Sequence, residues 1–415
     1  MDKGPGNFHR RRTDMSCKYL TVRRMKEALV PDSLVYLGVV LFTVKVELSM
    51  QDLFPVPEQL DNGLAAAALL VMLFCAVKDW NSPREMTLCA MGLGIIALAA
   101  VRTGIYHLLI TSVTVLALGG KNVQKAVKLI FNWKCLFFLL FLVLALVLDR
   151  AGVRSIWMYN EDLRRLLVGE SHVLLRLGYR HYTAPGGVVF ALTQLWCYLH
   201  FGSIKKRQLL ALLAVQLAIF QLTSSRMPLL MTIFLTALVY VYQKRTARKN
   251  PLLHTAAAAA PMALFAVFLV ILVNCRGWGP LIWKLDGIMS TRLAQPAVWY
   301  CYRGLSLFGD AIRGLQPDGS AFHVAQVAQL DNLYLMMMVW QGIAPFLVVA
   351  LCIFLLARQR NAAVNVMLLS WAVAGIAESD GLNCYMAFPL ILTAMAIPKK
   401  KTSWGPERNS QFHVE

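Results

Sequence analysis

Long runs of apolar residues, separated by short charged segments, form the dominant pattern of the chain. A helix that crosses a membrane needs about 20 mostly apolar residues, and the pattern predicts twelve spans. Their approximate ranges are 29–48, 60–77, 86–101, 103–119, 130–148, 185–203, 207–223, 227–243, 256–275, 333–357, 363–379 and 383–398. We therefore expect an all-α transmembrane domain over 29–398, preceded by a basic arm (1–28) and followed by a tail (399–415).

Two of the segments between spans, 149–183 and 276–331, are long. A long charged loop between apolar helices is either functional or disordered. Segment 276–331 also contains Trp278, Trp283 and Trp299, and such apolar content argues against disorder. We interpret 276–331 as a folded cap on the membrane surface.

The distribution of lysine and arginine predicts the orientation of the spans. When the loops are assigned alternately to two sides, one set holds almost twice as many basic residues, in short runs such as Lys205-Lys206-Arg207. The positive-inside rule makes that set cytoplasmic, so both termini are expected inside and both long segments outside. The hydrophobic fraction of 58% also indicates a polytopic membrane protein. The net charge of +19 is then expected at the anionic inner leaflet, not on nucleic acid.

The basic residues on the predicted outer side are nearly all arginines, with Lys45 and Lys284 as the exceptions. The orientation rule does not require arginine there. A planar guanidinium that is always charged suits the recognition of phosphate or carboxylate groups. The outer face is therefore predicted to bind an anionic substrate.

Four polar groups fall on this outer face. They are Arg176 to Tyr182, the turn Ser224-Ser225-Arg226, the cap arginines Arg276, Arg292 and Arg303, and Asp331-Asn332-Leu333-Tyr334 together with Glu378. Each has a structural interpretation as well, such as an interfacial anchor at Arg180-His181 or an N-cap at Asp331-Asn332. In the functional interpretation, the arginines bind a diphosphate and Asp331, Glu378 or His181 acts as general base. No metal-ligand spacing is present, so neither a metal nor a cofactor is expected.

The cysteines and the ionisable residues within spans complete the pattern. Most of the nine cysteines lie in apolar runs, and Cys275 and Cys301 can pair only if the outer segment folds back, so no disulfide framework is expected. Lys134 is expected near a helix end, with its ammonium reaching toward the inner surface. The first span is expected to be retained, without a cleavable signal peptide.

The order of these motifs resembles that of the Wzy-type O-antigen and capsular polysaccharide polymerases, especially the Firmicutes forms. The likeness covers roughly 130–398 and rests on a set of short motifs. They are Tyr179-Arg180-His181, Ser224-Ser225-Arg226, Ser290-Thr291-Arg292-Leu293, Leu307-Phe308-Gly309, Leu330 to Tyr334 with Gly342, and Glu378. The resemblance implies a metal-independent glycosyltransferase of the bacterial cytoplasmic membrane. Its substrate would be an oligosaccharide repeat unit on undecaprenyl diphosphate.

The resemblance also implies roles for residues and partners. Arg226, Arg276 and Arg292 would clamp the diphosphate and sugar, with Arg180, Arg303, Asn332 and Tyr334 as further substrate-binding residues. Asp331 stands where relatives often carry histidine, and His181-Tyr182-Thr183 departs from their His-Pro-Asn, which leaves the identity of the base open. A flippase and a chain-length regulator are implied protein partners, beside membrane lipid.

Three alternatives stay open at the level of sequence. An O-antigen ligase shares the architecture. A histidine at position 331 would favour a ligase, but this chain has aspartate there. A flippase or other transporter typically shows internal repeats and ionisable residues near the membrane midplane. We find no repeat, and His107 and Lys134 are the main ionisable residues within spans. A purely structural subunit does not explain the outer arginines.

Overall fold

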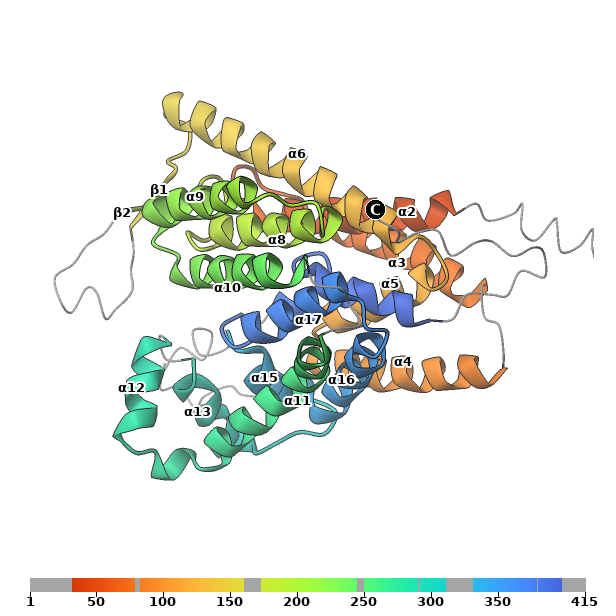
Figure 1. The fold of residues 1–415 in the computed structure, drawn as a ribbon. Coiled ribbons are helices and arrows are strands. Elements are labelled where there is room, and N and C mark those ends of the chain that lie inside the picture. Colours follow the sequence, from red (N-terminus) through yellow and green to blue (C-terminus); the bar gives the residue numbers. More distant parts are fainter. Residues whose placement is uncertain are drawn as a thin grey trace, which may run out of the picture.

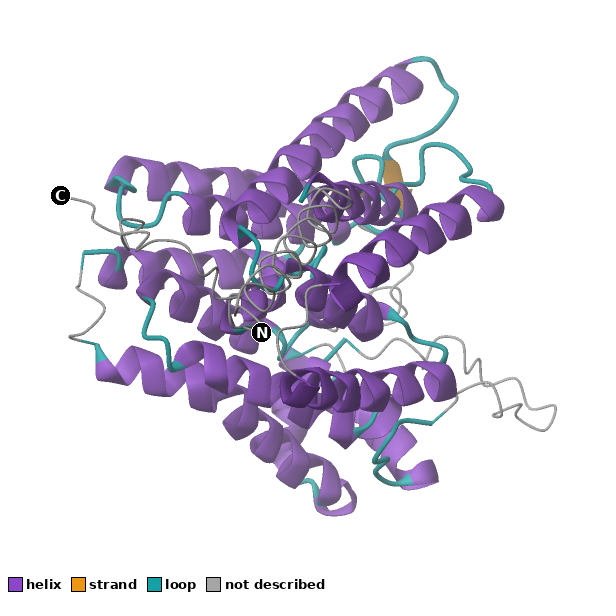
Figure 2. Cartoon of the chain, turned by 90° about the vertical axis from the view of Figure 1, so that its right-hand side faces the viewer, coloured by secondary structure: helices purple, strands orange, loops and turns teal. Residues whose placement is uncertain are grey.

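The computed structural model describes residues 32–78, 83–159, 173–244, 250–289, 292–310, 331–378 and 380–397. This part of the chain is almost entirely helical (Figure 2). Its α-helices are α2 (Ser33–Met50), α3 (Glu58–Lys78), α4 (Pro83–Thr103), α5 (His107–Leu118), α6 (Val123–Arg150), α8 (Ala184–Leu199), α9 (Lys206–Thr223), α10 (Arg226–Tyr242), α11 (Pro251–Val273), α12 (Pro280–Ile288), α13 (Ala294–Arg303), α15 (Leu333–Met336), α16 (Ile343–Ala357) and α17 (Ala362–Ala374). The all-α prediction is confirmed.

The irregular elements are few. Short 3₁₀ helices occur at η2 (Cys275–Gly277), η5 (Asp380–Leu382) and η6 (Phe388–Ala396), and a π-helix, η4, at Met337–Gln341. The strands found in the described residues are β1 (Trp157–Tyr159) and β2 (Val173–Leu175), which pair antiparallel with Trp157 opposite Leu175.

Five described helices, α2, α3, α4, α6 and α11, are long and apolar enough to cross a membrane. Five more, α5, α8, α10, α16 and α17, are apolar but have fewer than 18 residues. At 1.5 Å per residue these shorter helices extend roughly 18–26 Å, less than the roughly 30 Å hydrocarbon core of a bilayer. The helices are compatible with a multi-pass membrane protein, but the predicted count of twelve spans is not confirmed.

The tenth predicted span, 333–357, is interrupted. Gly342 separates η4 from α16 with φ 103° and ψ 150°, a backbone conformation that a residue with a Cβ rarely adopts. The segment after α13 crosses this break and bonds to it: Ser306 N donates to Met338 O at 3.1 Å, and Ile343 N donates to Ser306 O at 2.9 Å. Irregular backbone is tolerated at membrane depth only where protein or water satisfies its polar groups. The loop Leu307-Phe308-Gly309 and Gly342 therefore form one packing unit.

The last predicted span, 383–398, is not one long helix. Its regular part is the 3₁₀ helix η6, whose nine residues extend only about 18 Å at the 3₁₀ rise. The segment before η6 is bonded to α5, because Thr111 Oγ1 donates to Leu382 O at 2.6 Å and accepts from Cys384 N at 3.0 Å. η6 packs inside the bundle, where its buried apolar residues lie against α5, α16 and α17.

Lys134 lies in the interior of α6, where its side chain is 1% exposed and forms an ion pair with Glu47 of α2. The prediction that its ammonium reaches the inner surface is wrong. An opposite charge on a neighbouring helix makes burial tolerable, because paired ionisable groups inside a membrane avoid an isolated charge in hydrocarbon. Glu47 did not stand out in the sequence, since it sits near the end of an apolar run.

Candidate functional site

The predicted substrate-binding and catalytic residues gather at the end of the bundle that carries the β1–β2 pair, α12 and α13 (Figure 1). We call this end the cap end. Several contacts tie its segments together. Gln51, after α2, pairs with Tyr179 before α8, and Leu333 N at the start of α15 donates to Gly375 O after α17 at 2.8 Å.

His181, Arg292 and Asp331 form the centre of the candidate site. They come from three segments: the turn before α8, the turn before α13 and the approach to α15. Arg292 Nη2 donates to Asp331 Oδ2 at 3.4 Å, and the two side chains are 17% and 34% exposed. His181 interacts electrostatically with the Asp331 carboxylate. The Arg292 guanidinium thus contacts the Asp331 carboxylate at a partly open position, within electrostatic reach of the His181 imidazole.

Partial removal of solvent shifts the two titratable groups toward their neutral forms. Burial raises the pKa of Asp331 above its ordinary value, against the opposing effects of Arg292 and His181. Desolvation lowers the pKa of His181, although its side chain is exposed by area, and the Asp331 charge offsets part of that shift. A general base is most effective when its pKa lies near the working pH. The shift at Asp331 is in the direction that makes it a better base.

Asp286 fixes the segment that carries Arg292. This aspartate of α12 is 2% exposed, and its Oδ1 accepts hydrogen bonds from Leu293 N at 2.9 Å and Ala294 N at 3.0 Å. It therefore caps α13 from another helix and holds the residue just before Leu293. The Arg292 Nε is buried and has no hydrogen-bond partner among the described residues. The sequence does not indicate a role for Asp286, because no local pattern pairs it with residues 293 and 294.

Asn332 and Tyr334 fix the approach of Asp331. Asn332 is fully buried; its side chain accepts from Leu335 N at 3.0 Å as the N-cap of α15 and donates to Ile376 O at 2.7 Å. The buried Tyr334 hydroxyl donates to Ala372 O at 2.6 Å. Both side chains thus hold α15 against α17, as the N-cap interpretation of Asn332 anticipates. Their role as substrate ligands stays a prediction.

Glu378 lies at the cap end too. It lies four residues after the end of α17. It also lies two residues after Ile376, whose carbonyl oxygen accepts a hydrogen bond from the Asn332 amide. Its side chain is half-buried. The third candidate base is therefore close in sequence to the segment that holds Asn332, the residue next to Asp331.

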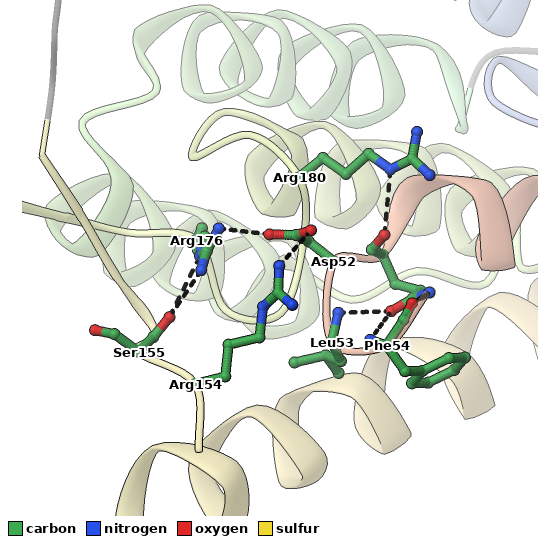
Figure 3. A network of polar contacts seen from close by, with 8 residues as sticks. Asp52, Leu53, Phe54, Arg154, Ser155, Arg176 and Arg180 are labelled. Carbon is green, nitrogen blue, oxygen red and sulfur yellow. Dashed lines mark hydrogen bonds and ion pairs between the residues drawn. The ribbon is translucent and has the colours of Figure 1, made fainter. Parts of the chain in front are cut away.

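The remaining predicted arginines lie around this centre. Arg226 is the exposed first residue of α10, and Arg276 is exposed in η2, directly after α11. Arg180 is exposed, and its Nε donates to Gln51 O at 3.3 Å (Figure 3). Arg303 ends α13, but its side chain lies outside the described residues, as do Ser290, Thr291 and 311–330.

A second charged cluster supports the turn that bears Arg180 and His181. Asp52 lies between two guanidinium groups, with Arg154 Nη2 at 2.6 Å from its Oδ1 and Arg176 Nη1 at 2.5 Å from its Oδ2 (Figure 3). The backbone reinforces this contact, because Asp52 N donates to Gly178 O at 2.8 Å. The carboxylate joins the α2–α3 connection to the segments after α6 and before α8. The sequence did not single out Asp52, whose arginine partners are more than 100 residues away.

Comparisons with known proteins identify no relative of this chain. No family model, no curated protein and no solved structure matches this chain. Within the residues that the structure describes, no group of three or more His, Cys, Asp or Glu side chains is placed to hold a metal ion.

Proposed function

We propose that this protein polymerises oligosaccharide repeat units carried on undecaprenyl diphosphate, at the outer face of a bacterial cytoplasmic membrane. The observation that supports the proposal most is the contact between Arg292 and Asp331 at one end of an apolar helical bundle, with His181 near enough to interact electrostatically with Asp331. These residues come from separate motifs of the resemblance to Wzy-type polymerases. Such a grouping offers a base beside an anion-binding group.

In the proposed reaction, a hydroxyl oxygen of the incoming repeat unit attacks the anomeric carbon of the growing chain. The bond between that carbon and the diphosphate oxygen breaks, and its electron pair leaves with the lipid diphosphate. Asp331 accepts the hydroxyl proton as general base, a role that its raised pKa favours. His181 interacts electrostatically with Asp331 and is the second candidate.

The arginines stabilise the leaving diphosphate in this proposal. Charge-assisted bonds to a guanidinium offset the negative charge that develops as the bond to the sugar breaks. Arg292 is the nearest candidate, because its guanidinium contacts the proposed base and keeps a buried Nε without a partner among the described residues. The exposed Arg180, Arg226 and Arg276 lie at the same end of the bundle and would attract the lipid-linked substrates.

A transporter of lipid-linked oligosaccharides is the second candidate, and two observations favour it. The Glu47–Lys134 pair is an ionisable site inside the bundle, and the helix that starts at Leu333 is discontinuous at Gly342. Both features are frequent in transporters. However, Glu47 and Lys134 neutralise each other, and backbone of the segment 306–310 fills the break. The proposed polymerase activity gives roles to more of the polar residues at the cap end than transport does.

The test is deletion of the gene in its host, followed by separation of the surface glycans by size. Plasmids would restore the wild type, Arg292→Ala, Asp331→Asn or the control Arg207→Ala, which removes an exposed arginine from the start of α9 at the opposite end. We expect the deletion to export single repeat units without polymer. The wild type and the control should restore the polymer, and the two site variants should not.

The other outcomes separate the alternatives. Repeat units retained inside the cell would indicate a transporter. Full-length polymer that stays on its lipid carrier would indicate a ligase. An unchanged glycan profile in the deletion strain would overturn the proposal.

A further inference from the structure

Two cysteines at the cap end lie in contact. Cys275 is the first residue of η2, directly after α11, and Cys301 lies on α13; their Sγ atoms are 3.6 Å apart. Cys301 is exposed and Cys275 is partly exposed. The other described cysteines belong to the bundle itself: Cys75, Cys89, Cys135, Cys197, Cys352 and Cys384.

The segment between the two cysteines is weakly packed. α13 contacts α11, and it buries Ala297 and Trp299. α12, which lies between the two cysteines in the chain, buries only Asp286 and leaves Leu281 and Ile288 more than 70% exposed. Apolar burial is the main stabilising contribution to folding, and α12 has little of it. A covalent link across this segment would supply the constraint that its packing lacks.

We propose that Cys275 and Cys301 form a disulfide that closes the segment bearing Arg292. In the reaction the two thiols lose two protons and two electrons, and a bond forms between the two Sγ atoms. The electrons pass by thiol–disulfide exchange to the disulfide of a thiol oxidoreductase, which is reduced to two thiols. The Sγ atoms must approach by about 1.5 Å to reach the length of a disulfide.

This inference does not rest on the proposed function. It requires the contact between the two thiols and an oxidising compartment around the cap, which the orientation predicted from lysine and arginine supplies. It also assigns a consequence to the site, because Arg292 lies inside the closed loop. The disulfide would restrict the movement of the Arg292 guanidinium relative to Asp331.

The experiment counts reducible thiols in the full-length protein. Membranes are denatured in acid, free thiols are blocked with N-ethylmaleimide, and the protein is then reduced and labelled with maleimide-polyethylene glycol. We expect two labels on the wild type and on the control Cys135→Ser, and none on Cys275→Ser or Cys301→Ser. No label on the wild type, or labels only after treatment with copper phenanthroline, would overturn the proposal.

A second measurement does not depend on variants that fold. Trypsin should release Leu293–Arg303, which contains Cys301, linked to the peptide that ends at Arg276. The linked mass should be two hydrogens below the sum of the free peptides and should disappear on reduction. Recovery of both peptides with N-ethylmaleimide attached would contradict the disulfide, and so would a link between two copies of either peptide.

Discussion

Removal of the Lys134 charge should destabilise the fold by about 4 kcal/mol at pH 7. Glu47 and Lys134 are 0% and 1% exposed; Lys134 pairs with Glu47 Oε1, and Glu47 Oε2 has no hydrogen-bond partner among the described residues. In Lys134→Met the stem volume is nearly kept, but the carboxylate stays in an apolar interior. An isolated buried carboxylate takes up a proton rather than remain charged. At pH 7 that uptake costs about 3.7 kcal/mol for a glutamate of ordinary acidity, within the roughly 3–5 kcal/mol expected when one partner of a buried pair is removed.

The free energy of unfolding can be measured by titration of the detergent-solubilised protein with sodium dodecyl sulfate, followed by tryptophan fluorescence. The double variant Glu47→Leu/Lys134→Met should lie within about 1–2 kcal/mol of the wild type, because both charges are gone. At pH 5 the deficit of Lys134→Met should fall to about 1 kcal/mol, since protonation becomes easier by about 1.4 kcal/mol per pH unit. Stability of this variant is lost as the pH rises, because a lone buried acid is protonated in the folded protein but ionised in the unfolded chain.

The control for this experiment is the exposed ion pair of Lys121 and Asp32. Its Nζ–Oδ1 distance is 2.8 Å, but the Asp32 side chain is 63% exposed. Lys121→Met should therefore change the free energy of unfolding by less than about 1 kcal/mol. Equal deficits for Lys134→Met and Lys121→Met, or a deficit of Lys134→Met that is independent of pH, would refute the reasoning. So would a double variant as unstable as Lys134→Met.

Three further predictions concern the cap end and the helix break. Gly342→Ala should destabilise the protein by more than about 2 kcal/mol, because φ is 103° and a new Cβ would meet Leu307 O at 2.7 Å. In the same unfolding assay Gly94→Ala, in open space on α4, should stabilise the protein by up to about 1 kcal/mol, because alanine is favoured over glycine within a helix. Asp286→Ala should cost about 1–2 kcal/mol through the lost cap on α13 and should shorten the surface polymer, whereas unchanged stability would argue against the cap. Polymerisation by isolated membranes should fall as the pH decreases, with a midpoint above the ordinary value for aspartate because burial raises the pKa of Asp331. Arg292→Lys keeps the positive charge beside Asp331 and should therefore leave that midpoint near the wild-type value, whereas a wild-type midpoint at or below the ordinary value for aspartate would argue against Asp331 as the base.

The sequence singles out residues of the site that the structure brings together, but it leaves their roles open. Arg292 and Asp331 were singled out as outer-face residues, and the structure brings them into contact at 3.4 Å. The polar groups of Asn332 and Tyr334 bond to the backbone of neighbouring segments, and their predicted role in substrate binding stays a prediction. A polar side chain next to a helix start fits both roles in a sequence. Only the position of its partner separates them.

The sequence by itself determined that the chain is helical and where most helices lie. Every predicted span overlaps a helical segment of the structure. The physical reason is local: a long apolar run satisfies its backbone polar groups most completely as a helix, because all of those bonds form within the segment. The positions of the apolar runs also define which connecting segments are short and charged and which two are long.

Only the tertiary structure decided which distant residues meet. The Glu47–Lys134 pair, the cap that Asp286 places on α13, the filling of the break at Gly342 and the Cys275–Cys301 contact all join separate segments. These contacts depend on which helix faces pack together, and hydrophobic periodicity along one segment does not specify its neighbours. Between helices, the complementarity of charges, hydrogen-bonding groups and glycine surfaces selects the partners.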